Sequence, residues 1–184
     1  MSYNAMNNTP TIKAIPTYYQ GVRFRSRLEA KWAALFDQLN WSWTYEPYDL
    51  EGWAPDFAIK GKRGDILVEV KPVPGAAHSP EFDKAANHKA VSGSDILLLG
   101  HSPIREDEHC FIGLCNEVGM GSYFERAVVG KWNEAVTEGY CNEIQSYHDR
   151  ISGKSDGGYF GRQKPRDLML LWGQASNLVQ WVPN

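Results

Sequence analysis

The stretch at residues 65–71 constrains the fold of this chain more than any other part of its sequence. It is apolar and rich in β-branched side chains, and Pro72 ends it, so it predicts a β-strand. Because side chains alternate between the faces of a strand, one face comprises Ile66, Val68 and Val70. The other face comprises Leu67, Glu69 and Lys71. The first face can pack against a core, while the second directs Glu69 and Lys71 together into a cleft.

The preceding residues predict a partner for this strand. Residues 53–59 form the expected strand, with the apolar Phe57 and Ile59 on one face. Asp56 follows a proline and lies on the opposite face. The glycines that come next, between this strand and the following one, predict a hairpin loop. In such a hairpin, Asp56 would lie beside Glu69.

A third carboxylate, Glu29, lies upstream in a helix predicted at residues 23–40. The helix is expected because apolar residues recur at helical spacing: Leu28, Trp32, Leu35, Phe36 and Leu39. Glu29 borders this stripe, which suits a carboxylate that faces the sheet. Ser26 and Glu29 also have the spacing of a capping box, in which Glu29 would accept hydrogen bonds from backbone donors at the helix start. Both roles stay open at this stage, and they are compatible.

Three carboxylates and one lysine in this arrangement suit metal-assisted hydrolysis of a phosphodiester. Mg²⁺ prefers oxygen ligands and is usually held by one or two carboxylates together with substrate phosphate. The metal lowers the pKa of a bound water and offsets charge on the phosphorus oxygens, and Lys71 can stabilise the same charge. The alternative is an exposed ion pair between Glu69 and Lys71, worth roughly 0–1 kcal/mol. We favour the metal site because Pro55-Asp56 and the helix with Glu29 accompany the pair.

The order of these motifs resembles that of the PD-(D/E)XK nuclease superfamily, which has the restriction-endonuclease-like fold. Small proteins of phages and actinobacteria resemble the chain more closely. The likeness rests on four motifs: Tyr19-x-Gly21-x-x-Phe24-Arg25-Ser26-Arg27-Leu28-Glu29-Ala30-x-Trp32-Ala33, Tyr45-Glu46-Pro47, Pro55-Asp56-Phe57 and Val68-Glu69-Val70-Lys71-Pro72. It covers residues 17–100, and a segment at 171–181 extends it towards the C-terminus.

The resemblance implies an α/β fold in which helices flank a mixed central β-sheet. It further implies that Asp56 and Glu69 are ligands of Mg²⁺, with Mn²⁺ as a substitute and the Val70 carbonyl as a third ligand. Lys71 would act on the attacking water, and Glu29 would complete or support the site. The expected substrate is DNA, with RNA left open. The superfamily includes inactive members, so two other functions remain: a catalytically silent binding protein in phage–host conflict, and an assembly subunit.

Five basic residues are candidates for contacts with nucleic-acid phosphates: Arg23, Arg25, Arg27, Lys84 and Lys89. The two lysines belong to a helix predicted to start at Ser79-Pro80 and to continue to about residue 91. The net charge of −3 argues mildly against tight, indiscriminate DNA binding, because such affinity comes largely from phosphate neutralisation. An ordinary solvated face is the alternative for each basic cluster.

The remaining sequence gives coarser predictions. Strands are expected at residues 96–99, buried and parallel to a neighbour, and at residues 110–114. Helices are expected at residues 124–137, 141–151 and 166–178. Aromatic residues alternate between Trp41 and Tyr45. We favour a strand that presents them to the core, and a stacking platform for bases is the alternative.

Composition fits one domain with a sizeable core, since the chain has 184 residues, of which 42% are hydrophobic. Residues 1–16 are expected to form a flexible tail, and residues 17–184 a single nuclease-like domain. No run approaches the ~20 apolar residues of a membrane helix, so we expect no membrane contact and a cytoplasmic location in a bacterium or an infected host. The three cysteines are expected to be buried, reduced thiols. A homodimer stays open, since cutting both strands of a duplex would favour two-fold symmetry.

Overall fold

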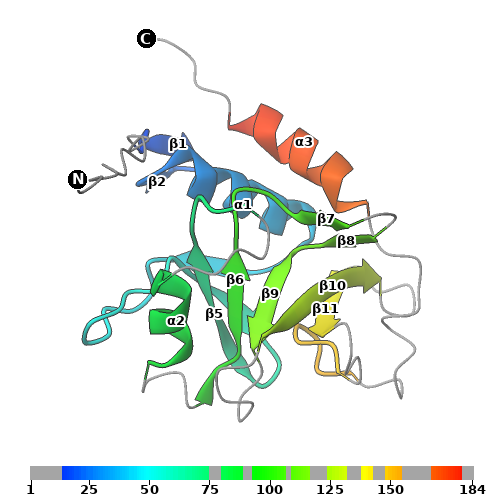
Figure 1. The fold of residues 1–184 in the computed structure, drawn as a ribbon. Helices are drawn as coiled ribbons and strands as arrows, with labels where there is room; N and C mark the ends of the chain where they lie inside the picture. Colours follow the sequence, from blue (N-terminus) through cyan, green and yellow to red (C-terminus); the bar gives the residue numbers. More distant parts are fainter. Residues whose placement is uncertain are drawn as a thin grey trace, which may run out of the picture.

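The structure is a computed structural model that describes residues 14–74, 80–88, 93–106, 109–116, 124–131, 138–142, 148–154 and 167–179. A mixed sheet of seven strands lies at its centre (Figure 1). In spatial order its strands are β11 (Glu138–Asn142), β10 (Glu125–Lys131), β9 (Gly113–Asn116), β6 (Ile96–Leu99), β5 (Gly64–Val70), β4 (Phe57–Gly61) and β3 (Trp43–Tyr45). β5 and β6 are parallel, and the other neighbours in this sheet are antiparallel.

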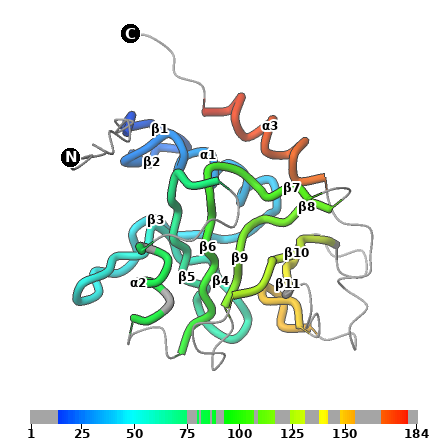
Figure 2. The backbone as a smooth tube through the Cα atoms, viewed as in Figure 1, coloured from blue at the N-terminus to red at the C-terminus, as the bar shows by residue number. Residues whose placement is uncertain are grey.

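Two short hairpins lie outside the main sheet. β1 (Thr17–Tyr19) pairs with β2 (Val22–Phe24), and β7 (Ile104–Glu106) pairs with β8 (His109–Phe111). Figure 2 follows the chain from the first hairpin into α1 and then through β4, β5 and β6 in the middle of the sheet. The described helices are α1 (Arg27–Gln38), α2 (Pro80–Ala86) and α3 (Leu168–Leu178).

Both faces of the central strand β5 are covered. Ile66, Val68 and Val70 belong to the main core, which also contains the buried apolar residues of α1 and α3. On the other face, Leu67 joins a smaller core that includes Phe82 of α2. α3 lies alongside α1 (Figure 1). The strand expected at residues 65–71 is thus confirmed, and it is more deeply buried than a strand with one exposed face.

The expected hairpin between β4 and β5 is also confirmed, although its first strand covers Phe57–Gly61 instead of residues 53–59. Lys60 pairs with Asp65 and Gly61 with Gly64, so a tight turn joins the two strands. The upstream helix begins at Arg27 instead of residue 23, because residues 22–24 pair with β1 as a strand. Ser26 follows this strand and is the N-cap of α1. Its hydroxyl accepts a hydrogen bond from the Glu29 N–H at 3.2 Å.

Two helix predictions in the second half of the chain were wrong. Residues 125–131 form β10, which pairs with β9 on one side and β11 on the other. Ala127 and Val129 enter the main core while Val128 packs on the opposite face, so burial on both faces selects the strand. Cys141 lies in β11 instead of starting a helix. Residues 132–137 and 143–147 lie outside the described residues.

Other expectations hold with adjusted boundaries. β6 is buried and parallel to β5, and α3 occupies most of the predicted C-terminal helix. The strand expected at residues 110–114 is divided at Ile112 into β8 and β9. α2 ends at Ala86, and residues 89–92 lie outside the described part, as do residues 1–13 of the expected tail. Within the described residues, no helix is long and apolar enough to cross a membrane.

The aromatic strand β3 packs against the core, as favoured. Trp41 is buried, and the rings of Trp43 and Tyr45 lie 5.7 and 5.3 Å from that of Phe57. Among the cysteines, Cys115 and Cys141 are buried free thiols and Cys110 is half-buried.

Candidate functional site

The β4–β5 hairpin brings Asp56 and Glu69 together at the same end of these two inner strands. Phe57 pairs with Val68, so the residue before β4 lies opposite the residue after Val68. Asp56 Oδ2 accepts a hydrogen bond from the Val70 N–H at 2.8 Å, which ties the two strand ends together. The proximity expected from the sequence is therefore present.

Lys71 lies between these two carboxylates. Its Nζ forms an ion pair with Glu69 Oε1 and lies 3.8 Å from Asp56 Oδ2. The same ammonium donates a hydrogen bond to the Val70 carbonyl at 3.2 Å. One positive group thus meets two carboxylates and one main-chain oxygen, at the C-terminal end of β5.

Both carboxylates are almost fully buried, with 2% of Asp56 and 4% of Glu69 exposed. The second oxygen of Glu69 accepts a hydrogen bond from Trp53 Nε1 at 2.8 Å. Burial, followed by the negative charge of Glu69, raises the pKa of Asp56 to about 6, although Lys71 and the Val70 N–H act in the opposite direction. The two buried acids thus attract positive charge to this end of β5, where Lys71 contacts both of them.

Glu29 takes the capping role that the sequence allowed. Its Oε1 accepts a hydrogen bond from Ser26 Oγ at 2.8 Å. Its Oε2 accepts from the Arg25 N–H at 3.2 Å and from the Tyr45 hydroxyl at 2.5 Å. Burial and the hydrogen bond to Glu29 raise the pKa of Tyr45. The two oxygens of Glu29 are therefore used by the start of α1 and by β3, and a role of Glu29 as metal ligand stays a prediction.

Arg25 connects this capping network to the carboxylate pair. Its Nη2 lies 2.5 Å from Asp56 Oδ1, and its Nε lies 2.8 Å from Glu46 Oε1. The side chain nevertheless remains 57% exposed. Asp56 thus has a different cationic partner on each oxygen, Arg25 on Oδ1 and Lys71 on Oδ2.

The other basic candidates are placed less closely. Arg23 is exposed on β2, and Lys84 is exposed on α2. Arg27 is half-buried at the start of α1, and its Nε has no hydrogen-bond partner among the described residues. Lys89 lies outside the described residues. Of the four candidates that the structure describes, Arg25 is the one with a direct contact to the site carboxylates.

Three residues that contact the site had not been predicted from the sequence as site residues. Glu46 pairs with Arg25, Tyr45 binds Glu29, and Trp53 binds Glu69. The segment Tyr45-Glu46-Pro47 was noted as part of the family resemblance, which was the signal that could have identified two of them. Nothing in the local pattern around Trp53 indicated that its indole N–H would orient a carboxylate.

The donor set fits Mg²⁺. Within the described ranges, no group of three or more His, Cys, Asp or Glu side chains is arranged to hold a metal ion. Mg²⁺ does not require such a group, because it is commonly held by one or two carboxylates and keeps several waters. Asp56, Glu69 and the Val70 carbonyl offer only oxygen atoms as ligands. The ammonium of Lys71 already lies against all three groups, so their oxygens attract positive charge.

Comparison with known proteins found no match to this chain among family models, curated proteins or solved structures.

Proposed function

We propose that this chain is a Mg²⁺-dependent nuclease that hydrolyses phosphodiester bonds in DNA and has a restriction-endonuclease-like fold. The observation that carries the proposal is the position of Lys71 between the buried carboxylates of Asp56 and Glu69. A cytoplasmic location follows from the same proposal, since that is where phage or bacterial DNA is found.

Burial separates this arrangement from an ordinary surface ion pair. An exposed pair contributes roughly 0–1 kcal/mol and needs no special position. Here two acids that are at most 4% exposed lie beside each other, and burial raises the pKa of Asp56. A carboxylate with a strongly perturbed pKa is typical of functional sites.

Asp56, Glu69 and the Val70 carbonyl would hold the metal ion. When bound, Mg²⁺ supplies activation of water and neutralisation of charge on the phosphate oxygens. Trp53 Nε1 and the Val70 N–H each fix one carboxylate, and this orients the metal-binding oxygens. Mn²⁺ would substitute because it also accepts oxygen ligands.

Lys71 would act on the substrate. In the metal-free protein its ammonium pairs with both carboxylates. With the metal charge in place, the same ammonium is able to donate hydrogen bonds to the attacking water or to the phosphate oxygen that gains charge. The exposed guanidinium of Arg25 would bind a neighbouring phosphate, for which its planar fork is suited.

A panel of labelled nucleic acids tests this proposal. Duplex, single-stranded, flap and junction DNA and matching RNA are incubated with the full chain in Mg²⁺, Mn²⁺ or EDTA. We expect metal-dependent cleavage of at least one DNA structure, and none in EDTA. Asp56→Asn should abolish it, whereas Asp37→Asn on α1 makes the same chemical change at an exposed position and should not.

Absence of cleavage of every substrate with both metals would contradict the proposal. In that case a catalytically silent binding protein becomes the better explanation, and Asp56 and Glu69 would be retained for folding or for partner binding.

A further inference from the structure

The two faces of the β1–β2 hairpin have different surroundings. The hairpin lies against α1, outside the main sheet (Figure 1). On its inner face Phe24 is fully buried, and Tyr19 packs against the main core and donates a hydrogen bond to Asp37 Oδ2 at 2.9 Å. Its outer face is formed by Tyr18 and Arg23, the middle residues of the two strands. The inner contacts therefore hold the hairpin in place while the outer face stays exposed.

Tyr18 and Arg23 lie directly opposite each other on this outer face. Tyr18 is 71% exposed, the largest value among the large apolar side chains that the structure describes, and Arg23 is exposed as well. Neither side chain forms a hydrogen bond, an ion pair or a ring contact with another described residue. Facing residues of an antiparallel pair have Cβ atoms about 4.5–5.5 Å apart. An aromatic ring and a guanidinium group are thus both available to a ligand at one place.

The chain connects this outer face directly to the candidate site. Arg25 follows Arg23 by two residues, which corresponds to roughly 7 Å of extended chain. The Arg25 Nη2 lies 2.5 Å from Asp56 Oδ1, and the Arg25 N–H donates a hydrogen bond to the Tyr45 hydroxyl at 3.0 Å. Because the Arg25 side chain is 57% exposed, basic groups that are open to solvent lead from the hairpin to the site carboxylates.

The charge of this segment suits an anionic polymer. Residues 14–28 contain three arginines and no acidic residue. Asp56 and Glu46 both pair with Arg25, whereas Arg23 has no acidic partner in the part of the chain that the structure describes. A phosphate would supply that counter-charge, since the planar guanidinium fork matches phosphate oxygens and can form two parallel hydrogen bonds with them.

We propose that the outer face of the β1–β2 hairpin binds a single-stranded segment of the nucleic-acid substrate, with one base stacked on Tyr18 and one phosphate bound to Arg23. This binding mode rests on the proposed nuclease function, since the strand is directed towards Arg25 and Asp56 as a substrate of that site. Aromatic rings beside basic groups bind single strands because every base has a face that can stack.

The same geometry disfavours a continuous duplex on this face. In a duplex each base is already paired and stacked between its neighbours, and taking it out of the stack costs free energy. The ring of Tyr18 would then have no base to contact, and only the phosphate contact of Arg23 would persist. The substrate class that this face selects is therefore nucleic acid with a single-stranded end, flap or gap.

Fluorescence anisotropy of labelled oligonucleotides with the full chain tests the stacking contact. EDTA is present throughout to prevent metal-dependent cleavage, and the probes are a single strand and the blunt duplex of the same sequence. Tyr18→Ala should weaken binding of the single strand by roughly 5–100-fold, the effect typical of a base stacked on an aromatic ring, and should change duplex binding less than twofold. Tyr18→Phe keeps the ring and should bind like the wild type. Leu170→Ala removes another exposed apolar side chain, on α3, and is the matched control.

The salt dependence of binding tests the phosphate contact. Arg23→Gln should weaken binding of the single strand and reduce the slope of log affinity against log salt concentration by about 0.7, the value for one phosphate contact of a single strand. Lys62→Gln removes a positive charge at an exposed position of the β4–β5 turn and should leave the slope unchanged.

The proposal is overturned if the single strand does not bind, if Tyr18→Ala weakens its binding no more than Leu170→Ala does, or if the duplex loses as much affinity as the single strand. Its failure can be told from that of the nuclease proposal. A wild type that cuts DNA, together with normal single-strand binding by Tyr18→Ala, would remove the hairpin contact alone. Single-strand binding that depends on Tyr18, in a chain that cuts no substrate, would remove the nuclease activity alone.

Discussion

The carboxylate of Asp56 accepts a hydrogen bond from the main-chain N–H of Val70 across the β4–β5 hairpin, at 2.8 Å. This bond fixes Asp56 beside Val70, the last residue of β5, which Lys71 follows. The same oxygen faces Lys71 Nζ, and the other oxygen binds Arg25. Asp56 is therefore the residue through which the hairpin, the lysine and the start of α1 are connected.

Asp56→Asn should weaken Mg²⁺ binding by roughly 10–100-fold or more, because it removes a charged oxygen ligand and keeps the shape of the side chain. Calorimetric titration with Mg²⁺ and Mn²⁺ measures the effect, and Asp37→Asn serves as the matched control. Equal metal affinity in the wild type and in Asp56→Asn would remove Asp56 from the ligand set.

The pKa of Asp56 gives a prediction for stability without metal. Folding raises this pKa from its usual 3.8 to about 6, so protonation favours the folded chain. The contribution, of the order of 2–3 kcal/mol, is fully present below about pH 4 and is lost as the pH rises through about 6. Urea unfolding in EDTA should show the free energy of unfolding of the wild type falling relative to that of Asp56→Asn between about pH 4 and pH 7. A difference that does not change with pH would contradict the raised pKa.

Two substitutions at the start of α1 separate capping from metal binding. Ser26→Ala should cost about 1 kcal/mol of stability, because it removes the N-cap acceptor for the Glu29 N–H. Glu29→Gln retains one oxygen that can accept from Arg25 and Tyr45, so Mg²⁺ affinity should change less than twofold. Calorimetry and urea unfolding measure both quantities. A large loss of Mg²⁺ affinity in folded Glu29→Gln would show that Glu29 also acts as a ligand.

Gly139 is predicted to tolerate no side chain. A Cβ at this position of β11 would lie 2.0 Å from Asp149 Oδ1, inside the carboxylate that orders the turn at residues 150–152. Gly139→Ala should therefore lower the free energy of unfolding by about 1–3 kcal/mol or more. Gly130, the residue paired with Gly139 on β10, has open space at its Cβ position and provides the control. Thermal unfolding that is equally affected by both alanine variants would contradict this packing.

The hairpin and its carboxylates could be predicted because their signals are local. Alternation along residues 65–71 and the glycines of the turn define the strands, and the pairing of Phe57 with Val68 then follows. Residues 125–131 could not be assigned in this way. Their strand is defined by pairing with β9 and β11 and by burial of both faces, and the local spacing of apolar residues shows neither.

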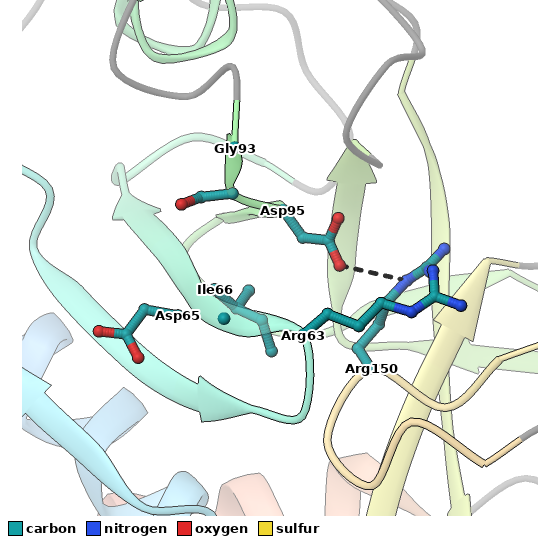
Figure 3. A pocket seen from close by; sticks show the side chains of 8 residues that line it. Arg63, Asp65, Ile66, Gly93, Asp95 and Arg150 are labelled. Atoms are coloured by element: carbon teal, nitrogen blue, oxygen red, sulfur yellow. Dashed lines mark ion pairs between the residues drawn. The ribbon is translucent and has the colours of Figure 1, made fainter.

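The contacts of individual side chains in the site could not be predicted from local sequence patterns either. Arg25 precedes Asp56 by 31 residues, and Trp53 precedes Glu69 by 16, so neither pair is visible as a motif. The sequence predicted Arg25 as a candidate for a phosphate contact, with an ordinary solvated face as the alternative, and did not predict its ion pair with Asp56. Arg63 and Arg150, which line a pocket where β5 and β6 begin (Figure 3), are still further apart in the sequence, and the β4–β5 turn packs against residues 149–153.

The most direct test of the proposed function is the rate of DNA cleavage by Lys71→Ala under single-turnover conditions, on a substrate that the wild type cuts with Mg²⁺. Lys60→Ala removes an exposed lysine of the same hairpin and is the matched control. Lys71→Ala should reduce the rate by ~10²–10³-fold, because it removes a donor to the charge that develops in the transition state, while Mg²⁺ binding persists. Lys60→Ala should cut at the wild-type rate. Cleavage by Lys71→Ala at the wild-type rate, or no cleavage by the wild type with Mg²⁺ or Mn²⁺, would contradict a nuclease site at the end of β5.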